Sequence, residues 1–275
     1  MKVISSDAII LRQRDFRERD RMITFLTRDK GKLTGIAKGA KVITGRGVGV
    51  YEPMTRGRVY YVESRSSDLV AIRKCDPIPP YLHLANDYDK FIMASYITEL
   101  AEICTDRSGT DEQLFELLAK GLQRISESPP RSLPLLRLAF ELNFLRCQGF
   151  QPEWSHCLNC GKTIFITKDD RPQLVRQQIH QFDPSLGGIL CPDCRAGGRG
   201  RVNLAPGTLA FFAKWRKFAA RTGSGVTTDP SLLSETHALD ELERAVTAHI
   251  VHHLERRPRS LSLLPVGTAG GDGRG

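Results

Sequence analysis

The chain has no apolar run long enough to cross a membrane. Nowhere in its 275 residues do the apolar positions approach the roughly 20 in succession that a transmembrane helix needs. The N-terminus carries Asp7 where a secretory signal peptide requires an unbroken apolar segment. We therefore expect a cytoplasmic protein.

Signatures of catalysis are also missing. The sequence contains neither the Gly-x4-Gly-Lys-Ser/Thr phosphate loop nor the Gly-x-Ser-x-Gly elbow of hydrolases. His249 and His253 have the spacing of a helical metal-ligand pair, but no Glu stands where a His-Glu-x-x-His zinc site requires one. We therefore interpret them, with His252, as core or surface residues. We expect a protein that is not an enzyme, and a nuclease built from scattered acids is the alternative.

Cysteine occurs seven times, and four of the seven form two pairs. These are Cys157-Leu158-Asn159-Cys160 and Cys191-Pro192-Asp193-Cys194. Each pair sets two thiolates on one tight turn, and two such turns can complete a tetrahedron around zinc. The 30 residues between the pairs exceed the usual spacing. They hold strand-like runs at 163–167 and 179–182 and a Leu186-Gly187-Gly188 turn, which predict a small hairpin that brings the pairs together.

Four sulfur ligands leave no open position on the ion, so we predict one structural Zn²⁺. Two redox-active pairs or unligated thiols are the alternative. The odd number of cysteines fits a reducing compartment. Cys75, Cys104 and Cys147 have no partner at ligand spacing, and we interpret them as ordinary buried residues.

Positive charge is concentrated near the N-terminus. Residues 12–46 hold eleven Lys or Arg against four Asp or Glu, and residues 1–80 hold 17 against nine. The remaining residues hold 23 against 22, close to neutral. The basic positions alternate with β-branched and aromatic ones, so the stretch is a folded unit with an electropositive face. Such a face is typical of a nucleic-acid-binding protein.

Five short strand-like runs and no long helix make up this N-terminal part. The runs are 3–11, 22–27, 32–37, 55–63 and 69–73. A closed barrel removes exposed sheet edges, and five strands fit the OB type. Periodicity alone does not separate an OB barrel from an SH3-like one.

Helical periodicity begins after Pro77, Pro79 and Pro80. We predict helices at 87–104, 133–147, 208–220 and 235–256, and one that starts at a capping box formed by Thr110 and Gln113. The fold class is α+β. The predicted domains are an OB-fold DNA-binding domain (1–80), a helical domain in two parts (81–152 and 203–262), a zinc-binding insert with four cysteine ligands (153–202) and a disordered tail (263–275).

Basic side chains on a barrel bind DNA through phosphates, which gives affinity without sequence preference and leaves the bases free to pair. The predicted DNA-binding residues are Arg12, Arg14, Lys32, Lys38, Lys41 and Arg46. Aromatic side chains stack on bases in many OB folds. The candidates for stacking are Phe16, Phe25, Tyr51, Tyr60 and Tyr61, some of which must belong to the core.

Several segments, taken in order, resemble the bacterial recombination mediator family RecO over nearly the whole chain. They are Glu18-Arg19-Asp20-Arg21, Thr24-Phe25-Leu26-Thr27, Gly31-Lys32-Leu33, Ala37-Lys38-Gly39-Ala40-Lys41, Phe182-Asp183-Pro184, Gly187-Gly188-Ile189-Leu190-Cys191 and Arg259-Ser260. Two departures are visible. Val42-Ile43-Thr44 stands where the family often has further basic residues, so the basic role at that loop shifts to Arg46. Near the C-terminus, Arg259-Ser260 replaces the usual Lys-Ser pair.

The resemblance implies an OB barrel and a helical domain that carries an inserted zinc module. It also implies a non-catalytic protein of the RecFOR pathway of DNA damage repair, which binds single- and double-stranded DNA and anneals complementary strands. Its implied partners are RecR and the C-terminal tail of the single-stranded-DNA-binding protein, and with RecR it helps to load RecA. Such a protein is cytoplasmic and nucleoid-associated. The alternatives are a zinc-ribbon nuclease or another DNA-processing enzyme, and a sequence-specific regulator.

Overall fold

The structure is a computed structural model of the 275-residue chain. It describes residues 2–42, 49–64, 66–78, 84, 86–105, 109, 111–168, 171–175, 177–195, 200–222 and 235–264. The chain divides into two compact units. Unit 1 comprises Met1–Glu127 and Pro258–Leu264, and unit 2 comprises Ser128–Arg257 and Pro265–Gly275.

Five strands of unit 1 close into a barrel. They are β1 (Ile4–Phe16), β2 (Asp20–Thr27), β3 (Gly31–Ala37), β4 (Arg56–Val62) and β5 (Leu69–Pro77). The order around the barrel is β1-β2-β3-β5-β4, in which β1 is antiparallel to β2 and β4, and β3 is parallel to β5. A simple meander would pair β3 with β4. The crossover to β5 therefore identifies the OB type and confirms the predicted barrel.

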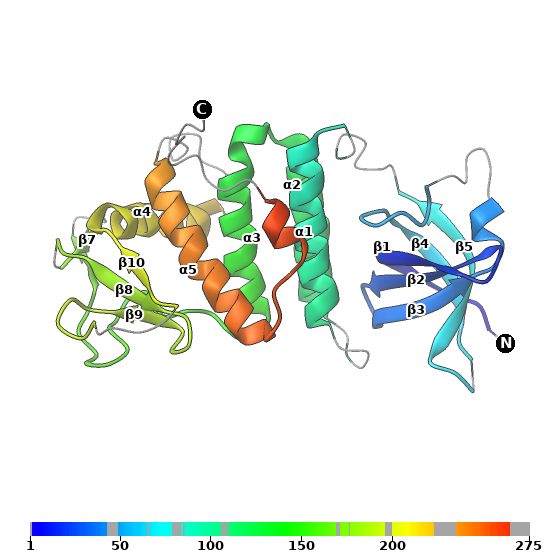
Figure 1. The fold of residues 1–275 in the computed structure, drawn as a ribbon, viewed down its shortest axis with the longest axis horizontal. Coiled ribbons are helices and arrows are strands. Elements are labelled where there is room, and N and C mark those ends of the chain that lie inside the picture. The colour runs from blue at the N-terminus through cyan, green and yellow to red at the C-terminus, as the bar shows by residue number, and fades with distance from the viewer. Residues whose placement is uncertain are drawn as a thin grey trace, which may run out of the picture. The chain divides into compact units, whose positions relative to one another are not determined.

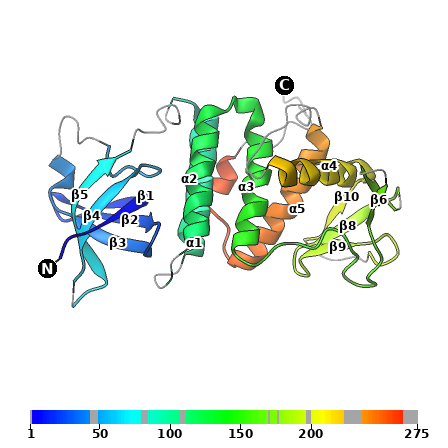
Figure 2. The same cartoon turned by 180° about the vertical axis from the view of Figure 1, so that it is seen from behind.

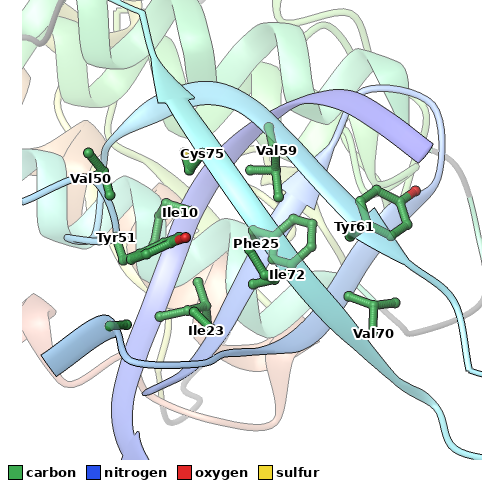
Figure 3. Close-up of a cluster of buried hydrophobic side chains, with 13 residues drawn as sticks. Ile10, Ile23, Phe25, Val50, Tyr51, Val59, Tyr61, Val70, Ile72 and Cys75 are labelled. Carbon is green, nitrogen blue, oxygen red and sulfur yellow. The ribbon is translucent and has the colours of Figure 1, made fainter. Parts of the chain in front are cut away.

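Alternate residues of each strand fill the barrel. Phe25 and Tyr61 meet edge to face with ring centroids 6.1 Å apart, and Figure 3 shows both among the aliphatic side chains of the core. Burial raises the pKa of Tyr51 to about 12 and that of Cys75 to about 11, so both are neutral core groups at pH 7. Because successive side chains of a strand point to opposite faces, the residues between these positions lie outside the barrel.

Unit 1 also contains two helices. α1 (Tyr88–Cys104) and α2 (Glu112–Glu127) lie side by side (Figure 1). α1 also contacts β1. Asp87 accepts the Lys90 backbone N–H at 3.1 Å and Asp111 accepts that of Leu114 at 2.8 Å, so an aspartate caps the start of each helix. The predicted capping box is thereby corrected: Asp111 has the capping role, and Thr110 lies outside the described residues.

The segment Pro258–Leu264 packs on unit 1 although it follows unit 2 in the chain. The Glu99 carboxylate on α1 accepts the backbone N–H groups of Arg259 and Ser260, both at 2.9 Å, and the Ser260 hydroxyl at 2.5 Å. This contact uses the backbone of residue 259 and not its side chain. An Arg-Ser pair therefore serves there as well as Lys-Ser.

Unit 2 combines three helices with two small sheets. The helices are α3 (Leu133–Cys147), α4 (Pro206–Thr222) and α5 (Thr236–Leu254), and the strands are β6 (Phe165–Lys168), β7 (Arg171–Leu174), β8 (His180–Asp183), β9 (Gly188–Leu190) and β10 (Val202–Leu204). β10, β8 and β9 form one sheet, which lies beside α4 and α5 in both views (Figures 1 and 2). Trp154 joins this sheet to α4, since its ring lies 5.0 Å from that of Phe182 and 4.3 Å from that of Phe212.

A buried ion network connects α3 to α5. Arg137 Nε lies 3.0 Å from Glu141 Oε1, its Nη1 lies 3.0 Å from Glu243 Oε2, and its Nη2 donates to Thr247 Oγ1 at 2.7 Å. Two buried carboxylates thus share one guanidinium. Burial raises the pKa of Glu243 to about 7; Arg137 opposes this shift, and Glu141 and Asp240 add to it.

Replacing Glu243 with glutamine is expected to flatten the pH dependence of stability. Between pH 4.5 and 7 the Glu243 carboxyl ionises in the unfolded chain, whereas it keeps its proton in the folded chain. The free energy of unfolding of the wild type therefore falls by up to roughly 3 kcal/mol as pH rises through this range. Glu243→Gln has no such group. The difference in Tm between wild type and variant should fall from pH 4.5 to about 7 and then level off. A constant difference over this range contradicts the raised pKa.

The predicted helices and strands are confirmed, with shifted ends. β1 continues to Phe16 and β5 to Pro77, beyond the predicted ends at 11 and 73, and most residues of both extensions are exposed or partly exposed. Leu263 ends a short 3-10 helix and Leu264 is buried, in contrast to the tail predicted from residue 263. α1 and α2 fall in unit 1 and α3 in unit 2. The division into domains stays a prediction.

Candidate nucleic-acid interface and metal centre

The two Cys-x-x-Cys turns come together in unit 2. The Sγ atoms of Cys157, Cys160, Cys191 and Cys194 all lie within 4.8 Å of one another, and those of Cys160 and Cys191 are 3.7 Å apart. A tetrahedral ion with sulfur ligands at 2.3 Å needs about 3.8 Å between sulfurs. The four thiols thus fit a single ion. In the part of the chain that the structure describes, this is the only such group of Cys, His, Asp or Glu.

Local hydrogen bonds shape both turns. In the first, the Cys157 carbonyl accepts the Gly161 N–H at 2.9 Å, and Gly161 has a φ of 70° that favours glycine. In the second, the Cys191 carbonyl accepts the N–H of Cys194 at 3.0 Å. The β8–β9 hairpin leads directly into Cys191, and Leu158 N–H donates to the Ile189 carbonyl at 2.9 Å. The hairpin predicted between the two pairs is confirmed.

The local environment affects two of the thiols in opposite directions. Burial raises the pKa of Cys191 to about 12, and hydrogen bonds with the Cys194 and Cys160 side chains add to the effect. Burial also acts on Cys157, but backbone N–H groups, including that of Cys191, outweigh it and lower the pKa to about 6. Of these two thiols, Cys157 is therefore the one that loses its proton more readily.

The turn before Cys191 is held by Asp183 and by a close backbone contact. Asp183 accepts hydrogen bonds from the Ser185 hydroxyl at 2.6 Å and the Leu186 N–H at 3.2 Å, and it pairs with Arg201 Nε at 2.6 Å. Burial alone would raise the pKa of Asp183, but these bonds lower it. Gly188 packs so closely against the backbone of Glu153 that a Cβ at position 188 would lie 2.5 Å from the Glu153 carbonyl oxygen.

Gly188→Ala is therefore expected to destabilise unit 2 by roughly 2–3 kcal/mol, because two backbone segments would have to move apart. Gly207→Ala on α4 is the matched control, since a Cβ at Gly207 has no atom within 4 Å and alanine favours a helix. Urea unfolding of the two variants compares them. Equal stabilities would show that the backbone around Gly188 can move to accept a Cβ without loss of stability.

The histidines of α5 do not form a metal site with other described residues. His249 is buried, and its Nδ1 and Nε2 lie 2.8 Å from the Pro184 carbonyl and 3.0 Å from the Phe150 carbonyl. His253 stacks on Phe150 with ring centroids 4.1 Å apart. Both roles are structural, as the sequence predicts.

Basic side chains gather on one outer face of the barrel. On β1, Arg12 and Arg14 lie opposite Thr24 and Met22 of β2, which in turn pair with Thr34 and Ile36 of β3. Lys38 directly follows β3, and Arg73 lies on β5, where both are exposed. We call this surface the basic face: Arg12, Arg14, Lys38 and Arg73 around Met22, Thr24, Thr34 and Ile36.

The predicted DNA-binding residues differ in their surroundings. Arg14 Nη2 donates to the Met22 sulfur at 3.0 Å, and no acid among the described residues lies within ion-pair distance of Arg14. Lys41 Nζ lies 3.2 Å from Asp15 and donates to the Arg17 carbonyl at 2.8 Å. Arg12 and Lys32 both contact Glu102 of α1. Arg46 lies outside the described residues.

The structure also sorts the aromatic candidates. Phe25, Tyr51 and Tyr61 are buried in the barrel core (Figure 3), whereas Phe16 and Tyr60 are partly exposed. The Arg17 guanidinium lies 5.2 Å from the centre of the Phe16 ring. Arg73 is absent from the predicted set, although alternation along the predicted strand 69–73 could have indicated that it faces outward.

Comparisons with known proteins agree over nearly the whole chain. The family model "Recombination protein O N terminal" matches residues 1–81, and "Recombination protein O C terminal" matches residues 85–262. DNA repair protein RecO of Anaeromyxobacter sp. (strain K) is 32% identical, with 94% of each chain covered. The proteins of the same name from Myxococcus xanthus and Symbiobacterium thermophilum are 32% and 28% identical over 96% of this chain, and cover 98% and 97% of their own lengths. Among the described residues, no helix is both long and apolar enough to span a membrane.

Proposed function

Because this chain belongs to the RecO family of DNA repair proteins, we propose that it is a recombination mediator that binds single- and double-stranded DNA on the basic face. The observation that carries the proposal is the exposed group of Arg14, Lys38 and Arg73 on an OB barrel. Guanidinium and ammonium groups bind phosphates and release counterions, which gives affinity for any sequence. Met22 and Ile36 offer apolar contact area between them.

A protein that binds DNA through its phosphates can also anneal complementary strands. A strand held by its backbone keeps its base edges free, so a second strand can pair with it while both remain bound. Charge on the protein also offsets the repulsion between the two phosphate backbones. Neither effect consumes a nucleotide, so the protein needs no ATP for this step.

Family membership supports DNA binding and recombination partners in general. We further propose that the partners are RecR and the C-terminal tail of the single-stranded-DNA-binding protein, and that with RecR the chain helps to load RecA onto coated DNA. A protein with this role is cytoplasmic and nucleoid-associated.

We propose that the ion held by Cys157, Cys160, Cys191 and Cys194 is Zn²⁺. Four thiolates at tetrahedral spacing suit this ion, and they leave no position for water or substrate. Bound zinc would supply a cross-link between the first Cys-x-x-Cys turn and the β8–β9 hairpin. The hydrogen bonds of the two turns orient the sulfurs for it.

A nuclease is the alternative, and a single experiment separates the two functions. Labelled single-stranded and duplex oligonucleotides are incubated with the protein with and without Mg²⁺, with no nucleotide added, at several salt concentrations. The mediator should bind both DNAs more weakly as salt rises and leave them intact. Cleavage that depends on Mg²⁺ would favour the nuclease, and preference for one duplex sequence would favour a regulator.

A further inference from the structure

Glu102 in the last turn of α1 contacts two of the basic residues predicted to bind DNA. Its Oε1 lies 2.6 Å from Arg12 Nη2, and its backbone carbonyl accepts Lys32 Nζ at 2.8 Å. The Glu102 side chain is 17% exposed and that of Arg12 is 59% exposed. Arg12 is thus open to solvent on one side while a carboxylate occupies the other.

These contacts offer Arg12 and Lys32 the same chemistry as a DNA phosphate. Carboxylate and phosphate oxygens both accept charge-assisted hydrogen bonds from a guanidinium, with similar geometry. The carbonyl of Glu102 is one of the last of α1, and such carbonyls carry the partial negative charge of the helix C-terminus. The end of α1 therefore acts as an anion toward the barrel.

Arg14 shows what the basic face is like without such an acid. It lies two residues from Arg12 on the same side of β1, a separation of about 7 Å along the strand. Its guanidinium contacts the neutral Met22 sulfur. Of these two neighbours, Arg14 can accept a phosphate directly, whereas Arg12 must first leave Glu102.

Charge pairing between barrel and helices is repeated nearby. Arg28, in the turn between β2 and β3, pairs with Glu116 of α2, and its guanidinium lies 5.4 Å from the centre of the Phe115 ring. Acids of both helices thus meet bases of the barrel. The Glu102 contact belongs to a consistent arrangement between these elements.

We propose that Glu102 is an autoinhibitory group that competes with DNA phosphates for Arg12. The proposal rests on the proposed DNA-binding function. In the free protein the carboxylate neutralises Arg12, and a DNA backbone that extends along β1 from Arg14 displaces it. Binding then releases the side chain of Glu102 while its carbonyl keeps Lys32.

Glu102→Gln tests the proposal because it removes the charge and leaves the carbonyl contact with Lys32 in place. An exposed ion pair is worth up to about 1 kcal/mol, so the variant should bind a single-stranded oligonucleotide roughly twofold to fivefold more tightly at low salt. Glu112→Gln, at an exposed acid in the first turn of α2, is the control for the change in net charge. It should change binding by less than the Glu102 variant.

A double-mutant cycle shows whether the gain passes through Arg12. In an Arg12→Ala background, Glu102→Gln should give no gain beyond that of Glu112→Gln. A gain that persists there, or binding by Glu102→Gln that is equal to or weaker than that of the control, overturns the proposal. If the wild type itself shows no salt-dependent binding, the proposed function fails instead. Thermal unfolding of each variant verifies that it is folded.

Discussion

Replacing Cys191 with serine is expected to abolish stoichiometric binding of zinc and to unfold the segment around the two Cys-x-x-Cys turns. The change removes one of the four sulfur ligands, while the backbone N–H of residue 191, which donates to Cys157 Sγ at 3.3 Å, is retained. Structural zinc contributes on the order of 10 kcal/mol to the folding of small metal-dependent domains. The strands of this segment are only three or four residues long, so we expect it to depend on the ion.

Metal analysis and limited proteolysis measure this effect. The wild type should contain one zinc ion per chain and resist cleavage between residues 153 and 202, whereas Cys191→Ser should lack the ion and be cleaved there. Cys147→Ser on α3 is the matched control, because Cys147 lies outside the thiol cluster. Full zinc content in Cys191→Ser would contradict a four-sulfur site. A different metal in the wild type would overturn the proposal of zinc alone.

Removing two bases from the basic face is the second change with a large expected effect. The double variant Arg14→Ala/Lys38→Ala should bind single-stranded DNA on the order of a hundredfold more weakly at low salt, because hydrogen bonds to charged groups contribute about 1.5 kcal/mol each. Each phosphate contact also steepens the plot of log K against log salt by about 0.7. The slope should therefore become shallower by about 1.4.

Lys120→Ala/Arg124→Ala is the matched control for this variant. Both residues are exposed on α2 of the same unit, so the change in net charge is equal while the basic face stays intact. The control should keep nearly the wild-type slope. Equal losses in the two double variants would mean that overall charge, and not this face, determines the affinity.

The metal centre could be predicted from sequence because its information is local. Two residues between paired cysteines fix the turn, and the only long-range requirement is that the pairs meet. The strand-like run ending at Phe182 predicts the hairpin that meets this requirement. The role of Gly188 could not be foreseen, because its neighbour across the contact is Glu153, far from it in the chain.

The sequence of residues 12–46 predicts a basic surface, but it does not predict which of the bases are paired with acids. Alternation along β1 separates Arg12 and Arg14 from the core, and the positive charge of the barrel is visible in the composition. Which base is neutralised depends in large part on acids contributed from elsewhere in the chain. Arg12 and Lys32 meet Glu102, some 90 and 70 residues later, and Arg28 meets Glu116. No pattern within residues 12–46 contains that information.

Helix capping gives a smaller example of the same kind. The pair Thr110 and Gln113 has the spacing of a capping box, yet Asp111 accepts the N–H of Leu114. Aspartate and threonine are both good caps, and adjacent candidates compete for the same backbone groups. A shift of one residue is too small for hydrophobic periodicity to resolve.

Nucleotide-free annealing tests the central claim most directly, which is that this protein mediates strand pairing through electrostatic contacts on its barrel. The rate at which two complementary oligonucleotides anneal is measured with wild type, Arg14→Ala/Lys38→Ala and Lys120→Ala/Arg124→Ala, from low to high salt. We predict that the wild type and the α2 control accelerate annealing and that this acceleration fades as salt rises. The barrel variant should lose most of the acceleration. No acceleration by the wild type, or acceleration that ignores salt and the barrel substitutions, would contradict it.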